Sequence, residues 1–573
     1  MLGRQFILFL FLAGLPVHIA AQTPHRYDVV IDEIFPDPTP PVKLPNAEFI
    51  EVINVSSAGY NLRNWQVVSG STSSTIKTDF MLMPDSIVVI CSSAAANDYA
   101  VYGTTIGISK FPSLNNDGDT IQLISPQGET IHSVVYDKSW YHNELKSLGG
   151  WSLEMIDTHN PCAGAGNWLA SANESGGTPG KVNAVNGRNP DEQAPSLLRT
   201  YSISDKEIVL VFDEPLDSFA AAQVDHYQID PAGVPNRAIP LTPQFSEVLL
   251  QFDYPLDARL VYGLTVSGIK DCSGNLMETM NSAKVGLPSP PLQGDLVINE
   301  ILFNPTANGY DYLELYNRSH KTIDLQHVYL ANRLPDGSLK NITPVCTSPY
   351  LFFPGEYDVI TEDSAWVEQH YVVRNTGAMI EISSLPSMPD DEGDIILLDD
   401  QGNVMDELHY NHQWHFPLIS NEEGVALERI DYNRPTQDPA NWTSAASTVN
   451  FGTPTYQNSE FRVEEAHPSG ISISPKIFSP DHDGFEDDCL ISFQFSNPGY
   501  TANITIFDAA GRPVRYLVQN ATLGVSGQFR WDGLDDKQNR LPMGIYIVFI
   551  EVFTIKGETK RFKSAVTIAG KMR

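Results

Sequence analysis

The sequence predicts an all-β protein built from tandem β-sandwich domains. Its 573 residues are 42% hydrophobic and only 18% charged, and 40 glycines and 40 prolines are spread among short runs rich in Val, Ile, Tyr and Thr. Such runs are typical of strands, and Gly and Pro mark the turns between them. The chain is long enough for roughly three to five domains, each with its own core.

A duplication is the second observation behind this fold class. The order Ile31-Asp32-Glu33-Ile34 returns as Ile298-Asn299-Glu300-Ile301, and both copies close on Gly-Thr-Pro, at Gly177 and Gly452. Only two copies are present, so the pattern favours duplicated domains of about 160 residues over a solenoid of many short repeats.

Alternation within the copies is the third observation. Phe49-Ile50-Glu51-Val52 and Tyr312-Leu313-Glu314-Leu315-Tyr316 alternate with period two, as expected of half-buried strands. Turn signals follow at short intervals, for example Asn116-Asp117-Gly118 and Asp400-Gln401-Gly402. Many short strands joined by tight turns are typical of a β-sandwich.

The N-terminus predicts export. Arg4 is followed by an apolar run from Phe6 to Val17 and then by small residues, which is the order of a secretory signal peptide over residues 1–21 with cleavage after Ala21. The apolar run is shorter than the ~20 residues that a spanning helix needs, so we expect no membrane span in the mature chain. The expected location is the cell surface or the extracellular space.

The charge balance narrows the class of partner. Asp and Glu outnumber Lys and Arg by 70 to 36, which gives a formal net charge of −34. This charge repels the phosphates of nucleic acid and of anionic lipid surfaces. We therefore expect no nucleic-acid partner, and a surface glycan or a protein as the ligand.

The cysteines predict one disulfide. When the two copies are aligned, both Cys91 and Cys162 of the first copy face threonines of the second, Thr361 and Thr436, so the two cysteines change together. In an exported protein this predicts a Cys91–Cys162 bridge, and the alternative is two buried thiols. The remaining cysteines, Cys272, Cys346 and Cys489, are left unassigned, and no CxxC pair suggests a zinc site.

Both copies resemble the lamin-tail domain, an immunoglobulin-like (Ig-like) β-sandwich. The resemblance rests on the order I-N-E-I, then Y-L-E-L-Y-N, then a Pro-Gly turn before a strand, then G-D-I-I-L-L-D-D-Q-G, read in residues 298–402 and repeated in the first copy. It implies one lamin-tail domain over 22–188, the first copy, and another over 291–458, the second copy.

The segment between the copies resembles the bacterial Ig-like domains of surface-layer and adhesin proteins. The residues that carry this resemblance are Phe212-Asp213-Glu214-Pro215-Leu216-Asp217 and the late turn Asp271-Cys272-Ser273-Gly274-Asn275. Pro-rich joints at Asn189-Pro190 and Pro288-Ser289-Pro290-Pro291 bracket it, as expected of semi-stiff linkers. We assign residues 189–290 to this second domain.

The last segment, residues 459–573, resembles a further Ig-like domain, shared by flagellar hook-capping proteins and by C-terminal modules of secreted bacterial proteins. Its residues are Phe478-Ser479-Pro480-Asp481-His482-Asp483-Gly484-Phe485, then Trp531-Asp532-Gly533 and Met543-Gly544-Ile545-Tyr546. Some relatives of this kind are sorting signals for type IX secretion. The resemblance therefore implies the secretion machinery as a partner of this C-terminal domain.

The best candidate for a cation site lies in the C-terminal domain. Asp481, Asp483, Asp487 and Asp488 surround a Gly turn, and closely spaced carboxylates supply the oxygen ligands that calcium prefers. The segment is too short for an EF-hand loop. Calcium is the only cofactor that we expect, and the alternative is a solvated acidic turn.

Other chemistry-bearing residues favour structural roles. The pairs Glu33/Glu51 and Glu300/Glu314 could form a glycosidase-like carboxylate pair, but their recurrence in both copies is better explained by hydrogen bonds that fix strand ends. A strand would send His409 and His412 to opposite faces, so a metal site with His415 is disfavoured. Five tryptophans could line a sugar platform or fill cores: Trp140, Trp168, Trp414, Trp442 and Trp531.

The function predicted from the sequence is binding, adhesion or spacing without catalysis. The sequence has no G-x-S-x-G elbow, H-E-x-x-H motif, Walker loop or nucleotide-binding glycine fingerprint. Every long segment is also assigned to a small sandwich. The alternative is a glycan- or substrate-binding accessory subunit of a secreted hydrolase system.

Overall fold

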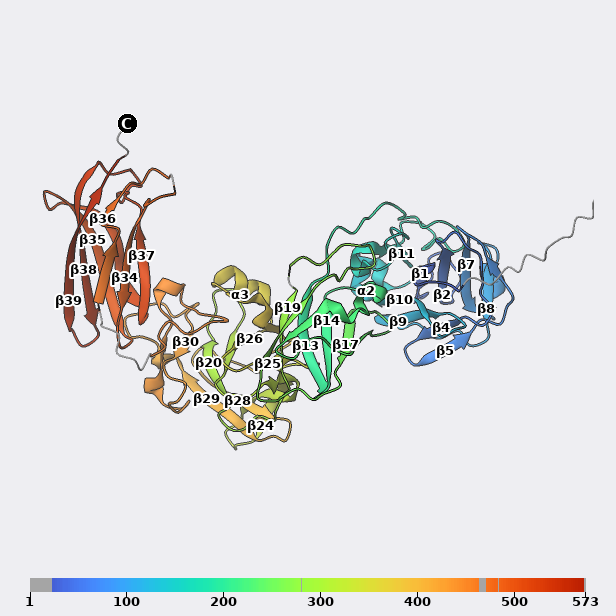
Figure 1. Ribbon diagram of the computed structural model, residues 1–573, viewed down its shortest axis with the longest axis horizontal. Helices are drawn as coiled ribbons and strands as arrows, with labels where there is room; N and C mark the ends of the chain where they lie inside the picture. Colours follow the sequence, from blue (N-terminus) through green and yellow to red (C-terminus); the bar gives the residue numbers. More distant parts are fainter. Residues whose placement is uncertain (1–22, 280, 463–469, 483, 571–573) are drawn as a thin grey trace, which may run out of the picture. The chain divides into compact units, whose positions relative to one another are not determined.

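The structure is all-β, as predicted, and its strands form many separate sheets (Figure 1). It is a computed structural model that describes residues 23–279, 281–462, 470–482 and 484–570. The predicted signal peptide, residues 1–21, lies outside the described residues. Within the described part, no helix has the length and apolar character needed to cross a membrane.

The chain divides into two compact units. One contains the residues up to 198 together with 209–252 and 264–283, and the other contains 199–208, 253–263 and the residues from 284 onward. The first unit thus joins the first copy to two long segments of the second domain.

The first copy is a sandwich of two main sheets (blue to cyan in Figure 1). A β-bulge in β1, between Ile31 and Glu33, shifts the register against β2, so that Glu33 faces Glu51 directly. The larger sheet has the order β12(Trp168–Ala170), β11(Leu153–Met155), β1(Val29–Phe35), β2(Phe49–Asn54), β7(Ile87–Ser92), β8(Thr105–Ile108), and the smaller has β10(Thr130–Asp137), β9(Gly118–Ile124), β4(Gln66–Ser69), β5(Thr72–Thr75).

The second copy repeats this topology strand for strand. Its bulge lies between Ile298 and Glu300, and Glu300 faces Glu314. The last strand pair of the larger sheet is parallel in both copies. The larger sheet runs β31(Trp442–Ser444), β30(Leu427–Arg429), β20(Leu296–Leu302), β21(Tyr312–Asn317), β26(Tyr357–Thr361), β27(Met379–Glu381), and the smaller runs β29(Val404–Asn411), β28(Glu392–Asp399), β23(Val328–Arg333), β24(Leu339–Pro344).

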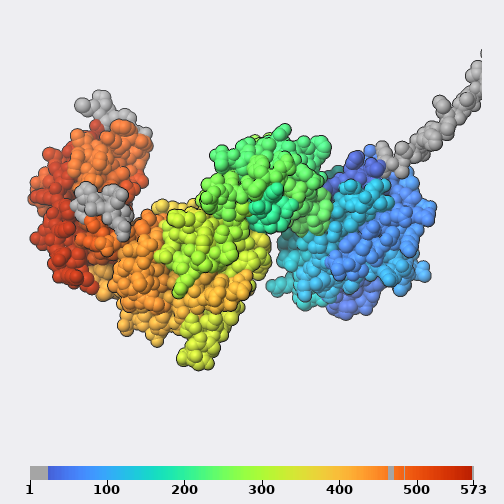
Figure 2. Space-filling view, turned by 60° about the horizontal axis from the view of Figure 1, so that its bottom comes forward, coloured from blue at the N-terminus to red at the C-terminus, as the bar shows by residue number. Residues whose placement is uncertain are grey.

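Each copy has a filled core between its sheets. Trp65, Tyr136 and Trp168 are buried in the first copy, and Tyr410 and Trp442 are buried in the second. Figure 2 shows a closed surface over the first copy, in blue. The apolar residues of period two identified in the sequence, such as Ile50 and Val52, point into these cores, because successive side chains of a strand alternate between its faces.

The second and C-terminal domains are also built from pairs of sheets. The second domain has the orders β13(Leu197–Ser204), β14(Glu207–Phe212), β17(Glu247–Gln251), β16(Arg237–Pro240) and β15(Tyr227–Asp230), β18(Tyr262–Val266), β19(Ser282–Val285). The C-terminal domain has β32(Gly470–Ser474), β34(Cys489–Gln494), β37(Ser526–Trp531) and β33(Ile477–Phe478), β39(Thr559–Ile568), β38(Gly544–Thr554), β35(Tyr500–Asp508), β36(Pro513–Leu523).

The remaining elements are short. Two small ribbons pair β3(Tyr60–Asn61) with β6(Met81–Leu82) and β22(Ile323–Asp324) with β25(Leu351–Phe352). The α-helices among the described residues are α1(Ala96–Tyr99), α2(Ser218–Ala221) and α3(Ser364–His370). In α2 and α3 an aspartate, Asp217 or Asp363, accepts a hydrogen bond from a first-turn N–H and so caps the helix.

Candidate functional site at the junction of the first copy and the second domain

A disulfide joins the first copy to the second domain, and it is not the one predicted from the sequence. Cys162 is bonded to Cys272, with the two Cα atoms 6.4 Å apart and a sequence separation of 110. Cys91 is a free, buried thiol. The predicted Cys91–Cys162 bridge is therefore wrong.

The position of Cys91 explains the error. It lies inside β7 opposite Phe49, and it packs in a small apolar cluster with Phe35 and Tyr99. Burial raises the pKa of this thiol to about 11, so it behaves as a small hydrophobic side chain. Cys91 and Cys162 are both replaced by threonines in the second copy although they do not touch. Joint replacement was therefore not evidence of a bond between them.

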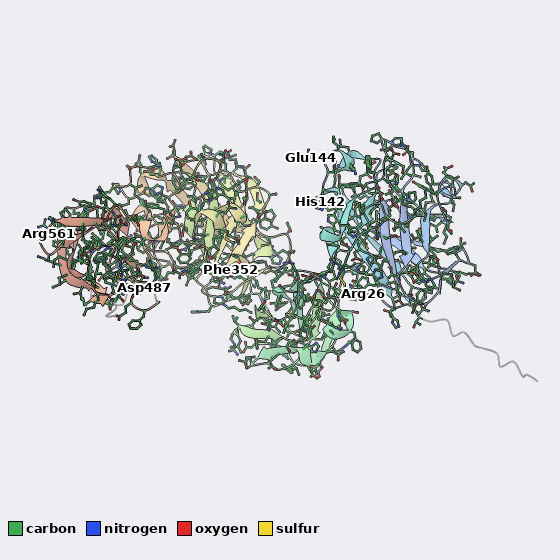
Figure 3. The ribbon with its side chains drawn as sticks, turned by 90° about the horizontal axis from the view of Figure 1, so that it is seen from above. Arg26, His142, Glu144, Phe352, Asp487 and Arg561 are labelled. Carbon is green, nitrogen blue, oxygen red and sulfur yellow. A yellow bond between two sulfur atoms is a disulfide. The ribbon has the colours of Figure 1, made fainter. Side chains whose placement is uncertain are left out.

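Polar contacts surround the disulfide. The Arg26 guanidinium donates to the carbonyl oxygens of Leu216 and Gln244, at 2.8 and 3.0 Å, and lies 3.9 Å above the centroid of the Phe245 ring. Ser133 Oγ donates to the Pro243 carbonyl at 2.6 Å. Figure 3 labels Arg26 at this junction. Sequence reasoning missed Arg26, because nothing in the pattern around it distinguishes it from a surface arginine.

A cavity of about 380 Å³ opens beside the disulfide. It is lined by residues of the first copy, including Trp140 and Arg26, and by residues of the second domain, including Glu214 and Gln244. Trp140 is half-buried and packs against the buried Trp168, with ring centroids 6.1 Å apart. An aromatic surface with a few polar groups is the usual composition of a small-ligand cavity.

Three carboxylates converge close to this junction. Asp191, Glu214 and Asp271 each place an oxygen within 4.8 Å of the other two, and no other metal-ligating trio among the described residues is as close. Asp271 is buried and accepts hydrogen bonds from the backbone of Gly274 and Asn275, so it also shapes the turn that carries Cys272. The sequence analysis missed this trio because its members lie far apart in the chain.

Charge repulsion within this trio is relieved by a proton. Burial, followed by the nearby charges of Asp191 and Asp271, raises the pKa of Glu214 to about 8. The raised pKa favours the protonated form of Glu214 at neutral pH, which lowers the repulsion within the trio.

The carboxylates Glu33 and Glu51 belong to a buried row that closes the first copy. Glu33 faces Glu51 on one side and Glu154 on the other, and all three are buried. Glu33 Oε1 accepts from the Thr178 amide at 2.8 Å, Glu51 Oε2 accepts from the Gly180 amide, and Glu154 Oε1 accepts from Thr178 Oγ1 at 2.8 Å. The row therefore holds the Gly-Thr-Pro segment against the sheet, which agrees with the structural interpretation of these glutamates.

The second copy carries the same row in Glu314, Glu300 and Glu428. Thr453 donates through its amide and its Oγ1 to Glu300, and Thr455 N donates to Glu314 Oε2 at 2.6 Å. The third glutamate, Glu154 or Glu428, was missed in the sequence. Comparing Leu153-Glu154 with Leu427-Glu428 would have found it, because the glutamate recurs at the same place in both copies.

Burial raises the pKa of several carboxyls in the two rows. It is the largest cause of the raised pKa of Glu33 and of Glu300, each about 8, and repulsion from a neighbouring glutamate is the second cause. Burial, followed by repulsion from Asp32 and Glu33, raises the pKa of Glu51 well above the ordinary value, and burial followed by repulsion from Glu300 does the same for Glu314. Like charges that face each other on adjacent strands are destabilising, so protons stay in the row at neutral pH.

The predicted calcium ligands have protein partners. Asp487 accepts hydrogen bonds from the amides of His482 and Gly484, at 2.6 and 2.9 Å, and Asp488 pairs with Arg530. Asp487 is labelled in Figure 3. Asp481 has one buried oxygen without a hydrogen-bond partner, and Asp483 lies outside the described residues. Calcium at this turn stays a prediction, and it would compete with Arg530 for Asp488.

The three histidines do not converge. His409 Nδ1 lies 2.9 Å from Asp394 and His412 Nδ1 lies 3.3 Å from Glu422. His415 is buried against Ser444, and burial lowers its pKa to about 4. Each ring has its own partner, but strand alternation does not explain this, because β29 ends at Asn411 and His412 begins a short 3-10 helix.

The tryptophans mostly fill cores. Trp168, Trp442 and Trp531 are buried, and Trp442 Nε1 donates to the Thr436 carbonyl at 2.8 Å. Trp414 is partly buried against the core of the second copy. Trp140 and Trp168 both line the cavity beside the disulfide, and Trp140 is the more exposed of the two, so it remains the candidate for stacking on a ligand.

Comparison with family models matches both copies to one family. Residues 22–138 and 289–412 match the model of the Lamin Tail Domain. Two segments of the chain are thus similar to this family. Because the two matches fall on segments with the same strand order, sequence and topology agree on the duplication. No curated protein matches the lamin-tail copies or the rest of the chain.

Several solved structures align with the chain at low TM-scores. FlgD from P. aeruginosa is 22% identical with a TM-score of 0.13, and it covers 14% of this chain and 62% of its own. The N-terminal part of the bacterial S-layer protein SbsC is 15% identical with a TM-score of 0.16, covering 28% and 44%. A tetra-tandem repeat from the extending region of a large adhesion protein is 12% identical with a TM-score of 0.13, covering 95% and 99%. The chain thus spans less than two thirds of the first two structures, and likenesses this weak carry no inference about function.

Proposed function

We propose that this chain is an exported, non-enzymatic, multidomain protein of the cell surface or extracellular space that acts in binding, adhesion or spacing. The observation that carries the proposal is the Cys162–Cys272 disulfide between the first copy and the second domain. Disulfides persist in oxidising compartments outside the cytosol, which supports export. A covalent joint, reinforced by Arg26, also limits bending between two domains, which suits a spacer.

Small-angle X-ray scattering tests the spacing role. The full chain is compared before and after selective reduction, and with the Cys162→Ser/Cys272→Ser variant. A locked joint predicts that both treatments broaden the distribution of interatomic distances, while the control Cys91→Ser leaves it unchanged. Identical scattering from all four samples would contradict the role of the disulfide in spacing.

The C-terminal domain is proposed to engage the secretion machinery, as its resemblance to sorting modules suggests. Its paired sheets form an independent core around Trp531. Deleting residues 471–573 tests the idea by cell fractionation. Retention of the shortened protein inside the cell envelope would support a sorting role, and normal appearance at the cell surface would contradict it.

The second candidate function is a glycan-binding accessory subunit. The observation that favours it is the cavity beside the disulfide, where Trp140 offers an aromatic surface and Glu214 and Gln244 offer polar groups. A glycan array with the full chain and with Trp140→Ala tests it. Binding that disappears in the variant would support this candidate, and the absence of binding in the parent would remove it.

A further inference from the structure

The two copies differ at a buried position where the row of glutamates meets the segment that follows Gly-Thr-Pro. We call this segment, residues 178–185 of the first copy and its counterpart after Thr453 in the second, the closing segment. In the second copy an amide group bridges two oxygens there. Asn299 Nδ2 donates to Glu314 Oε1 at 2.7 Å and to Asn458 Oδ1 at 2.6 Å. All three residues are buried, and this amide ties β20, β21 and the closing segment together. The bridge is possible because an amide nitrogen carries two hydrogens.

The first copy places an acid at the position of this amide. Asp32 occupies the position of Asn299, directly before the glutamate of β1, and Asn183 lies five residues after Thr178, as Asn458 lies five after Thr453. Asp32 Oδ1, Glu51 Oε1 and Asn183 Oδ1 are all buried and have no hydrogen-bond partner. Three acceptors therefore meet where the second copy has a donor between two acceptors.

Within the part of the chain that the structure describes, no positively charged group is among the charges that act on these oxygens. The charged groups that act on Asp32 and Glu51 are Glu33 from β1 and Glu154 from β11. The phenol of Tyr99, beyond β7, bonds to the Ala47 carbonyl instead. The closing segment contributes the Gly180 amide to Glu51 Oε2 and the Asn183 side chain, and neither group titrates.

Two further donors of the second copy are also missing from the first. Tyr312 donates its hydroxyl to Glu300, whereas the matching residue in β2 is Phe49. Ser459 donates to Glu428 at 2.9 Å, whereas the residue after Asn183 is Ala184. The first copy is thus short of donors at several points of the same network, and Glu33 Oε2 is left without a partner as well.

We propose that Asp32, Glu51 and Asn183 form a buried proton-binding site, in which protons on the two carboxyl groups replace the bridging amide of the second copy. One proton on Asp32 supplies a donor for one neighbour, and one on Glu51 supplies a second donor. Two protons thus satisfy all three oxygens without any change in the fold. Unpaired ions would leave carboxylates facing each other in a medium of low polarity, which is far more costly.

The consequence is a closing segment whose attachment depends on pH. The pKa of Asp32 is raised by burial to about 8, above the ordinary value of about 3.9. Because the folded state holds the proton more tightly than the unfolded state, the contribution to stability is complete below about pH 4 and is lost as the pH rises through about 8. Alkaline solution should therefore loosen residues 178–185 of the first copy.

The test compares the full chain with Asp32→Asn and with the reciprocal Asn299→Asp. Infrared spectroscopy reads the carbonyl band of protonated carboxyl groups, and hydrogen exchange followed by mass spectrometry reads the closing segments. The parent should show an acid band at neutral pH to which its other buried carboxyls also contribute, so the site is read from the difference between the parent and each variant. Asp32→Asn should lose part of the band and should protect residues 178–185 more than the parent at pH 9. Asn299→Asp should gain band intensity and should lose protection in the matching segment at pH 9.

Two results would overturn the proposal. One is equal pH dependence of exchange in the parent and Asp32→Asn. The other is a closing segment protected at pH 9 by calcium or magnesium in the parent but not in Asp32→Asn, because a cation would then be the occupant. If Asp32→Asn fails to fold, the reciprocal Asn299→Asp decides, since a closing segment of the second copy that keeps the parent's protection at pH 9 in this variant contradicts the proposal.

Discussion

Breaking the disulfide should destabilise the unit formed by the first copy and the second domain by several kcal/mol. The bridge closes a loop of 110 residues, and restricting the unfolded chain over such a length stabilises the folded state by about 5 kcal/mol at 25 °C in the chain-entropy treatment. The perturbation is Cys272→Ser combined with Cys162→Ser, so that no lone thiol remains at the junction. Cys91→Ser is the control, because Cys91 is a free thiol inside a strand.

Denaturant unfolding followed by tryptophan fluorescence measures the effect, since Trp140 and Trp168 lie in the affected unit. The double variant should unfold at a lower denaturant concentration with a similar slope, while Cys91→Ser should shift only slightly. Alkylation of the denatured, unreduced protein should label three thiols, those of Cys91, Cys346 and Cys489. Five labelled thiols, or a peptide that links Cys91 to Cys162, would refute the reasoning.

Three further predictions concern buried or clustered carboxyls. Glu214→Gln should weaken the loss of stability of its unit as the pH rises through about 8, because the folded state of the parent holds the Glu214 proton with a raised pKa and is destabilised when that proton leaves. Chemical denaturation at several pH values measures this, and an equal dependence of unfolding free energy on pH in parent and variant would count against it. Thr453→Ala removes a donor shared by Glu300 and Glu428, and calorimetry should find a loss of about 1–3 kcal/mol; no loss would show that the row does not hold the segment. Calcium should raise the melting midpoint of the C-terminal domain relative to chelator, and Asp481→Asn should abolish the rise; a midpoint that ignores calcium would remove the site.

The fold could be predicted because its signals are local and repeated. Period-two runs such as Phe49–Asn54 and Tyr312–Asn317 became the central strands β2 and β21 of the two copies. The duplication in the sequence also predicted that the two copies would share one strand order. Physical chemistry explains this success, since alternation of apolar residues and Gly-containing turns fixes register without knowledge of distant contacts.

The site could not be predicted to the same extent because its contacts are distant in sequence. Cys162 pairs with a residue of the next domain, and comparison of the two copies holds no information about the second domain. Asp191, Glu214 and Asp271 come together only through folding. The spacing of residues along the chain does not predict such long-range contacts. These contacts nevertheless determine the chemistry of the junction.

The difference between Asp32 and Asn299 was visible in the sequence but not interpretable there. An Asn-to-Asp change at a surface position would matter little. The difference between Asp32 and Asn299 matters because both residues are buried and because Asn299 bridges Glu314 and Asn458. Only the structure shows these two facts. Buried polar positions are where a one-atom difference changes the balance of donors and acceptors.

Protease shaving of intact cells, followed by mass spectrometry without reduction, tests the central claim most directly. The account predicts released peptides from both copies and one disulfide-linked pair that contains Cys162 and Cys272. That result would place the protein at the cell surface with its junction locked. Failure to release any peptide, or recovery of Cys162 and Cys272 only as free thiols, would contradict it.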